Sequence, residues 1–370
     1  MLWGLLGTAL LDTWYPQVSE KKGRIAGIIS YLKAHPLLCL LILTPGIPEY
    51  LSGSSNMAVL VVSPPLFFLL LAANLGLYGS GVILIREAKI RWNKGWASVF
   101  LLGAAYGIVE EGLALRTLFN PASSVVGNLG VYGHWLGVNW VWTIGLLIFH
   151  SVFSIGLPIF IFGLAFPDLK SKSLVSMKGI RLSLLALTVD SLLLSIFVNY
   201  WPAEITGLLV LSSIVVALLV IAAKKLPVDF LKSVRAEPRW RPRSFFLLGA
   251  VFFPITLLAG GFAAGANLFP PVVMIFDVVV SLWILRLVYR SMGTQLNQAH
   301  KVAFAFGLIS PIIMFGLAAS ASFPLVIMND IIVVLFSNKM WKKWKAWTFL
   351  QHSSFMQTLP KFGTNPGSVP

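Results

Sequence analysis

Apolar stretches of about 20 residues recur along most of the chain, separated by short polar connections. A helix of that length crosses the hydrocarbon core of a bilayer and satisfies its own backbone hydrogen bonds there. The sequence therefore predicts an all-α, polytopic membrane protein with about ten transmembrane helices. Their expected limits are 34–50, 64–86, 95–118, 137–166, 179–200, 203–223, 243–266, 268–290, 298–318 and 321–338.

Positive charge alternates from one connection to the next. Clusters of Lys and Arg precede the first stretch and follow every second one, whereas the connections between them contain neither residue. Because cytoplasmic loops carry the excess of Lys and Arg, both termini are predicted to be cytoplasmic. We expect one integral domain over 1–370 in the cell membrane: a cytoplasmic or interfacial N-terminus at 1–33, a ten-helix bundle at 34–338 and a basic cytoplasmic tail at 339–370.

The composition limits the partners that the chain can have. Of its 370 residues 57% are hydrophobic and 11% are charged, which a soluble domain could not bury. The net charge of +15 lies in short clusters that set topology, so we expect membrane lipids as partners and no nucleic acid. The only cysteine, Cys39, cannot form a disulfide within one chain, and no nucleotide-binding loop or haem motif is present, so no cofactor is expected.

Ionisable residues inside the apolar stretches are the candidates for function. Each costs about 2.5–3.5 kcal/mol to insert, so such residues are usually functional or paired. Four of the acids fall about nine residues from the outer edge of their stretches, or about 13 Å at helical rise, and are expected in one layer. The candidates are Glu49, Glu110, Glu111, His150, Asp190, Asp277 and Asp330 with its neighbour Asn329.

The third stretch can be assigned an inward face. Glu110 lies on a stripe with Gly103 and Gly107, whose small side chains allow helices to approach closely. Glu111 points about 100° further round and must reach another partner or a shared cavity. His150 lies near the middle of the next, antiparallel stretch, within reach of Glu110. Two adjacent carboxyls in a low dielectric are expected to hold one proton between them.

The segments "VEEGLALR" and "IFHSVF" resemble the core of the CAAX prenyl-protease and bacteriocin-processing family of intramembrane glutamate proteases. The resemblance implies that Glu110 activates a water, Glu111 and Arg116 orient it, and His150 stabilises the oxyanion. It also implies a membrane-embedded peptide as substrate, which a degenerate relative of the family would bind without cutting. Asn329 and Asp330 are the expected third motif. Four residues rather than three separate Glu111 from Arg116, which on an α-helix places Arg116 about 140° from Glu111.

Two other classes of protein remain open. A proton- or cation-coupled secondary transporter of a small solute would use Asp190, Asp277 and Asp330, on two five-helix halves of inverted topology. A scaffold protein would use the same acids to hold helices together. No metal is predicted, because one histidine with scattered carboxylates does not match the ligand spacing of a catalytic zinc site.

Overall fold

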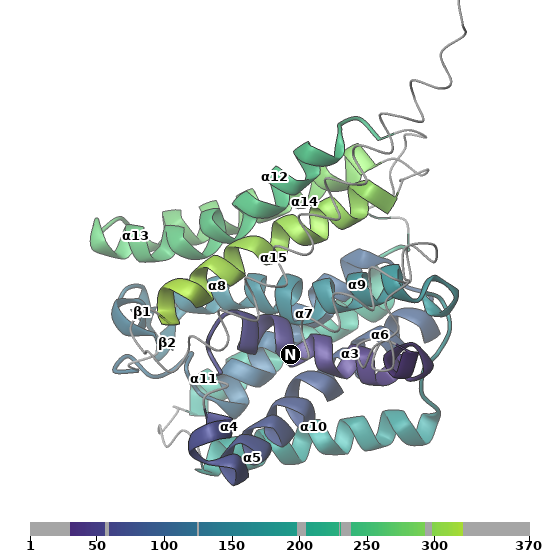
Figure 1. Ribbon diagram of the computed structural model, residues 1–370. Coiled ribbons are helices and arrows are strands. Elements are labelled where there is room, and N and C mark those ends of the chain that lie inside the picture. Colours follow the sequence, from purple (N-terminus) through teal and green to yellow (C-terminus); the bar gives the residue numbers. More distant parts are fainter. Residues whose placement is uncertain are drawn as a thin grey trace, which may run out of the picture.

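Almost every element of the computed structural model is a helix (Figure 1). The structure describes residues 30–55, 59–123, 126–197, 205–228, 230, 238–292 and 298–320. In chain order the elements are α3 Pro36–Pro45, η1 Gly46–Leu51, α4 Val59–Val62, α5 Pro64–Asn74, η2 Leu75–Gly79, α6 Ser80–Arg91, α7 Trp96–Ile108, η3 Val109–Ala114, η4 Gly127–Gly130, β1 His134–Trp135, β2 Val138–Asn139, α8 Trp140–Phe149, η5 His150–Gly156, α9 Leu157–Ala165, η6 Pro167–Leu169, α10 Met177–Phe197, α11 Ile205–Val220, η7 Ile221–Lys225, α12 Pro242–Phe253, η8 Pro254–Leu258, α13 Ala259–Gly265, α14 Pro270–Met292 and α15 Gln298–Ser320.

The all-α membrane fold is confirmed. Among the described residues, eight helices are long and apolar enough to cross a membrane. The first predicted stretch forms the shorter apolar helix Pro36–Leu51. The tenth stretch (321–338), the basic tail (339–370) and nearly all of the N-terminal segment (1–33) lie outside the described residues, so the count of ten stays a prediction. The eight helices are Pro64–Arg91, Trp96–Ala114, Trp140–Ala165, Met177–Phe197, Ile205–Lys225, Pro242–Gly265, Pro270–Ser291 and Ala299–Ala318.

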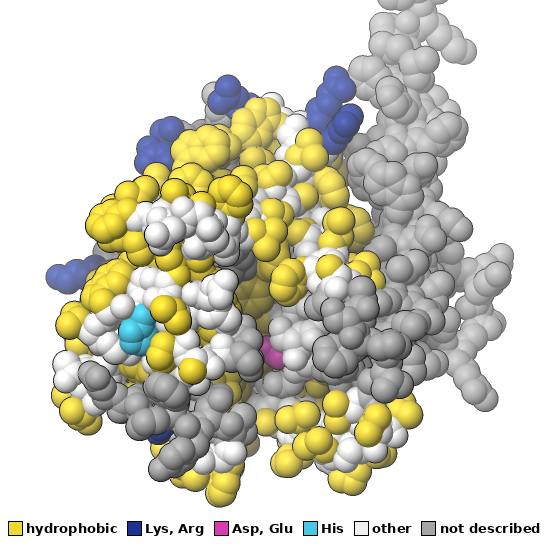
Figure 2. Space-filling model, turned by 90° about the vertical axis from the view of Figure 1, so that its left-hand side faces the viewer, with side chains coloured by type: hydrophobic (Ala, Val, Ile, Leu, Met, Phe, Trp, Pro, Cys, Tyr) yellow, Lys and Arg dark blue, Asp and Glu magenta, His cyan; other side chains and the backbone are white. Residues whose placement is uncertain are grey.

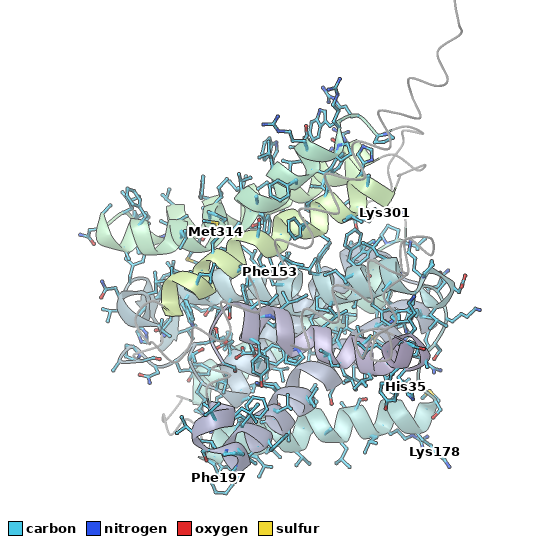
Figure 3. The ribbon with its side chains drawn as sticks, viewed as in Figure 1. His35, Phe153, Lys178, Phe197, Lys301 and Met314 are labelled. Atoms are coloured by element: carbon cyan, nitrogen blue, oxygen red, sulfur yellow. The ribbon has the colours of Figure 1, made fainter. Side chains whose placement is uncertain are left out.

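The helices pack in layers. Helices α12 to α15 lie together on one side, α3, α7, α8 and α9 form the middle, and α5 and α10 lie on the opposite side (Figure 1). Phe153 of η5 lies between the first two layers, where its ring contacts Phe252 and Phe253 of α12 (Figure 3). Inside the outer layer α12 and α15 touch through glycine, since a Cβ at Gly307 would lie 2.1 Å from the carbonyl oxygen of Phe246.

The two ends of the bundle differ in charge as the sequence predicts. His35, Lys178 and Lys301 lie toward one end, and Phe197 and Met314 lie toward the other (Figure 3). The positive-inside rule predicts that the end with the lysines faces the cytoplasm. The opposite end, which we call the outer end, carries the only sheet of the described residues (Figure 1).

That sheet is a two-stranded hairpin, which the hydropathy pattern did not predict. His134 pairs with Asn139 and Trp135 pairs with Val138, leaving a two-residue turn. Both turn residues have positive φ, 51° at Leu136 and 73° at Gly137. Positive φ at both positions is the signature of the type I′ turn, which matches the twist of two short strands.

Several membrane-crossing helices contain a π-helical segment. In a π-helix the backbone bond runs from residue i to i+5, and such segments occur mostly at functional sites. The segments within the described residues are η1, η2, η3, η5, η7 and η8. Four of them, η1, η2, η3 and η5, carry the ionisable side chains described next.

Candidate functional site

A carboxylate–histidine cluster forms where η3 meets η5. The Nδ1 atom of His150 lies 3.1 Å from Oε2 of Glu110, and its Nε2 atom lies 3.4 Å from Oε1 of Glu111. Glu110 and His150 are each about 1% exposed and Glu111 is half-buried. The predicted proximity of these three side chains is therefore found in the structure. Glu111, which the helix geometry turned toward a separate partner, shares His150 with Glu110.

Glycines of α7 allow this close approach. A Cβ added at Gly107 would lie 3.1 Å from Cβ of His150, and one at Gly103 would lie 2.7 Å from Cα of Ser151. Any larger side chain would push η5 away from α7 and move the imidazole out of reach of the carboxylates. The small-residue stripe predicted for this helix thus brings η5 against α7.

The ring of His150 is also oriented by its own segment. Ser154, four residues later in η5, lies with its Oγ 2.9 Å from the His150 Nδ1. A neutral imidazole carries one N–H, but here each ring nitrogen faces a carboxyl group. The cluster therefore holds at least one exchangeable proton inside the membrane.

Glu49 and two tyrosines extend the cluster beyond Glu110, Glu111 and His150. In η1, Glu49 accepts a 2.6 Å hydrogen bond from the hydroxyl of Tyr78 in η2 and a 2.7 Å bond from Ser55. It lies close enough to Glu110 and Glu111 to interact electrostatically with both. The rings of Tyr78 and Tyr106 lie 6.4 Å and 6.0 Å from the imidazole of His150. The sequence marked Glu49 as an intramembrane acid and placed Tyr106 on the stripe of Glu110, whereas nothing in the pattern marked Tyr78.

Glu111 is held from the outer side by the residues that follow it. The Thr117 hydroxyl donates a hydrogen bond to Oε2 of Glu111, and Asn139 donates its amide N–H to the carbonyl of Thr117 at 2.9 Å. Trp142 also donates to the Thr117 hydroxyl, at 3.4 Å. The loop between η3 and α8 therefore fixes the second carboxylate of the cluster.

The third helix ends earlier than predicted, and this changes the expected position of Arg116. Residues 109–114 are π-helical, and the amide of Leu115 donates to the carbonyl of Glu110, five residues earlier, at 2.8 Å. Arg116 then adopts the left-handed conformation, with φ of 55°. The rotation of about 140° between Glu111 and Arg116 assumed a continuous α-helix over 95–118 and was wrong.

The other predicted acids do not join the cluster. Asp190 of α10 packs against η2, where a Cβ at Gly76 would lie 3.1 Å from its carboxyl group. Asp277 of α14 is buried, and its Oδ1 has no hydrogen-bond partner among the described residues. No interaction recorded for the described residues connects either aspartate with Glu110. Asn329 and Asp330, the expected third motif, lie outside the described residues.

The cluster has the donor atoms of a metal site. One ligand atom each from Glu110, Glu111 and His150 lie within 4.8 Å of one another. Imidazole suits Zn²⁺ and carboxylates suit Mg²⁺ or Mn²⁺, and three protein ligands would leave a position for water. The sequence predicted no metal from ligand spacing alone, whereas the three-dimensional arrangement is compatible with one.

Solvent can approach an acidic group from the outer end. Figure 2 looks onto that end and shows an acidic side chain at the bottom of a narrow recess between apolar and neutral side chains. Charged groups inside a membrane usually face a water-filled cavity or the bundle interior. The recess is therefore a route by which water could reach the intramembrane acids.

Fold and site together define a multi-pass membrane protein with a carboxylate–histidine cluster inside its apolar helices. The chain belongs to an uncharacterized membrane protein family, whose model matches residues 38–252. The matched segment contains Glu49, Tyr78, Glu110, Glu111 and His150, whereas α14 and α15 follow it. No curated protein and no solved structure matches the chain.

Proposed function

We propose that this protein is an intramembrane hydrolase of the glutamate-protease type, acting on membrane-embedded peptides. The observation that carries the proposal is the placement of His150 between Glu110 and Glu111, at 3.1 and 3.4 Å. A buried imidazole between two carboxylates can move a proton and stabilise negative charge in the same small volume. Helix packing alone needs neither two adjacent carboxyls nor a histidine.

Each residue of the cluster has a role in peptide hydrolysis. Glu110 removes a proton from water while the water oxygen attacks the carbonyl carbon of the peptide bond. Protonated His150 stabilises the negative oxygen of the tetrahedral intermediate, and Glu111 with Arg116 orients the water. When the C–N bond breaks, Glu110 returns the proton to the leaving nitrogen, which yields a carboxylic acid and an amine.

The π-helical segment η3 supports the resemblance on which this proposal draws. The glutamate proteases that the sequence resembles have three residues between the Glu pair and the Arg, and this chain has four. A segment with bonds from i to i+5 accommodates one residue more than an α-helix over the same rise. The longer spacing is thus compatible with the same arrangement of Glu111 and Arg116.

A cleavage assay tests the proposal. Purified protein in detergent is given a panel of membrane-anchored peptides, and products are identified by mass spectrometry. We expect Glu110→Gln to lower the rate by about 10²-fold or more, since it removes a general base. Asp277→Asn is the matched control, because Asp277 is an equally buried intramembrane acid outside the cluster. Cleavage that survives Glu110→Gln contradicts the proposal.

The same assay decides the question of a metal. The proposed mechanism uses no metal ion, so cleavage should continue in the presence of EDTA. Activity that EDTA abolishes and Zn²⁺ or Mn²⁺ restores would assign the three cluster residues to metal binding. That result would support the hydrolytic function and contradict the metal-free mechanism.

A proton-coupled transporter is the second candidate. The observation that favours it is a series of ionisable groups that interact across three helical segments: Glu111 and Glu110 of η3, His150 of η5 and Glu49 of η1. Such a series can relay protons across part of a membrane. Solute uptake into proteoliposomes that follows a pH gradient and is lost in Glu49→Gln supports transport, whereas uptake indifferent to the gradient excludes it.

A further inference from the structure

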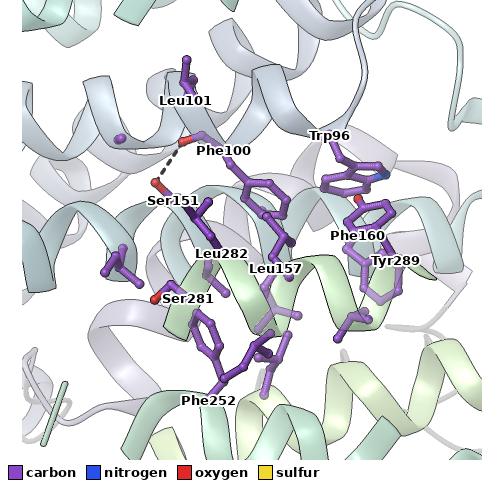
Figure 4. A pocket seen from close by; sticks show the side chains of 18 of the residues that line it. Trp96, Phe100, Leu101, Ser151, Leu157, Phe160, Phe252, Ser281, Leu282 and Tyr289 are labelled. Carbon is purple, nitrogen blue, oxygen red and sulfur yellow. Dashed lines mark hydrogen bonds between the residues drawn. The ribbon is translucent and has the colours of Figure 1, made fainter. Parts of the chain in front are cut away.

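An apolar cavity separates the middle layer of helices from the outer layer. Its volume is about 570 Å³, and it lies between α7, α8, η5 and α9 on one side and α12, α14 and α15 on the other. Aromatic rings line much of it, including Trp96, Phe100, Phe160 and Tyr289 (Figure 4). None of the ionisable side chains of the carboxylate–histidine cluster lines it. The volume lies within the range of about 300–1,000 Å³ that is typical of small-molecule sites.

Lysines gather at one end of this cavity. Lys170 and Lys301 contribute to its lining, and Lys301 lies toward the cytoplasmic end of the bundle (Figure 3). The two lysines interact electrostatically with each other. A third, Lys89, interacts with Lys170 and lies over the ring of Trp96 at 5.9 Å. Among the described residues no carboxylate forms an ion pair with any of the three.

The aliphatic stem of Lys170 is itself positioned by the fold. Its Cγ would lie 3.5 Å from a Cβ added at Gly163 of α9, so the stem runs along the helix that forms one wall of the cavity. An ammonium group placed this way extends from an apolar wall toward the headgroup level. Two lysines in the lining of an apolar cavity, with Lys89 interacting with one of them, complement a molecule with an anionic head and an apolar chain.

We propose that this cavity binds an anionic phospholipid of the cytoplasmic leaflet. Its phosphate lies between Lys170 and Lys301, and an acyl chain extends past Trp96 and Phe160 toward Ser151. Basic pockets between transmembrane helices on the cytoplasmic side are a known way to hold anionic headgroups. A zwitterionic lipid brings its own cation to the same place and gains nothing from the lysines.

Native mass spectrometry of the full chain in detergent tests the site. The protein is titrated with phosphatidylglycerol and, separately, with phosphatidylcholine of the same acyl chains. We expect the protein to bind phosphatidylglycerol more tightly than phosphatidylcholine. In the Lys170→Gln, Lys301→Gln variant, each replaced lysine should weaken the binding of phosphatidylglycerol by about fivefold. The matched control is Lys172→Gln with Lys178→Gln, two exposed cytoplasmic lysines that do not line the cavity.

A second pair of variants separates charge from fold and shape. Lys170→Arg with Lys301→Arg keeps both charges and should keep the affinity, which shows that the site tolerates substitution. Ala104→Trp fills the cavity and should remove phosphatidylglycerol while the lysines remain. Three outcomes would overturn the proposal. The two lipids could bind with equal affinity, or the glutamine variant could keep the affinity for phosphatidylglycerol. Palmitate could also bind as tightly as phosphatidylglycerol with the same dependence on the lysines. None of these outcomes depends on whether the protein cleaves peptides.

Discussion

At the scale of single residues, Gly107 has the clearest structural requirement. A Cβ there would lie 3.1 Å from Cβ and 3.2 Å from Cδ2 of His150. We predict that Gly107→Leu lowers the free energy of unfolding by about 1–3 kcal/mol, because η5 must move away from α7. The thermal unfolding of the detergent-solubilised protein measures this.

The matched control is Gly261→Ala in α13, where an added Cβ meets no atom within 4 Å. Alanine there should be neutral or slightly stabilising, as expected for a glycine in a helix interior. Equal effects of the two substitutions would contradict the close contact between Gly107 and His150.

Tyr78 is predicted to support the cluster through Glu49. Its hydroxyl donates a 2.6 Å hydrogen bond to Oε1 of Glu49, and Tyr78 itself is buried. Tyr78→Phe leaves that oxygen without a donor, which should cost about 1–3 kcal/mol of unfolding free energy. A double-mutant cycle with Glu49→Leu measures the coupling by chemical denaturation. If the two substitutions are additive, the hydrogen bond does not contribute to stability.

The sequence predicts the part of the site that lies on two consecutive helices better than the part contributed by a distant helix. Glu110, Glu111 and His150 could be predicted together because they lie on consecutive apolar stretches and a glycine stripe marks the contact face. Glu49 joins them only because η1 packs against η5, a contact between segments about 100 residues apart. Such a contact depends on packing across the whole bundle, and an apolar pattern does not specify it.

At the scale of elements, the π-helical segment η3 makes a prediction about chain length. Deleting Leu113 leaves three residues between Glu111 and Arg116, so the segment can return to α-helical spacing. We predict that this deletion changes the thermal unfolding temperature little and keeps whatever activity the cluster has. Deleting Leu101 in α7 should instead cost more than about 3 kcal/mol, because side chains before the deletion turn by about 100° relative to those after it. Similar losses from both deletions would argue against the role given to η3.

The hairpin at the outer end offers a stabilising substitution. Leu136 is 79% exposed and has φ of 51°, a conformation that costs most residues about 1–2 kcal/mol. Asn followed by Gly is the preferred pair for a type I′ turn, and Gly137 is already in place. We predict that Leu136→Asn raises the unfolding free energy by up to about 1 kcal/mol, measured by denaturant titration. Gly137→Val is the opposite control and should destabilise the protein.

For the secondary structure too, the sequence predicts some elements and not others. Long apolar helices follow from length and hydropathy alone, and the eight described membrane-crossing helices fall where such stretches were predicted. The π-helical segments and the hairpin were not predicted. Both depend on local backbone geometry at Leu136 and around Glu110, where hydropathy has no periodic signal.

At the scale of the whole molecule, the layered bundle separates the two proposed sites. The carboxylate–histidine cluster lies where η3 meets η5, and the apolar cavity with Lys170 and Lys301 in its lining lies between the middle layer and the outer layer of helices. Ser151 lines the cavity while its neighbour His150 belongs to the cluster, so η5 forms a wall between them. A lipid that shifts η5 would also shift the imidazole, and this is a physical route by which the membrane could influence the cluster.

This arrangement depends on the orientation of the bundle, which a labelling experiment can measure. Positive charge predicts that Lys172 is cytoplasmic and that Leu136, in the hairpin, is on the outer side. Cys39 is buried, and replacing it with serine leaves a chain without cysteine. In that background we predict that Leu136→Cys reacts with a membrane-impermeant maleimide on intact cells and that Lys172→Cys reacts only after permeabilisation. The reverse pattern would invert the bundle, and the recess of Figure 2 would then open to the cytoplasm.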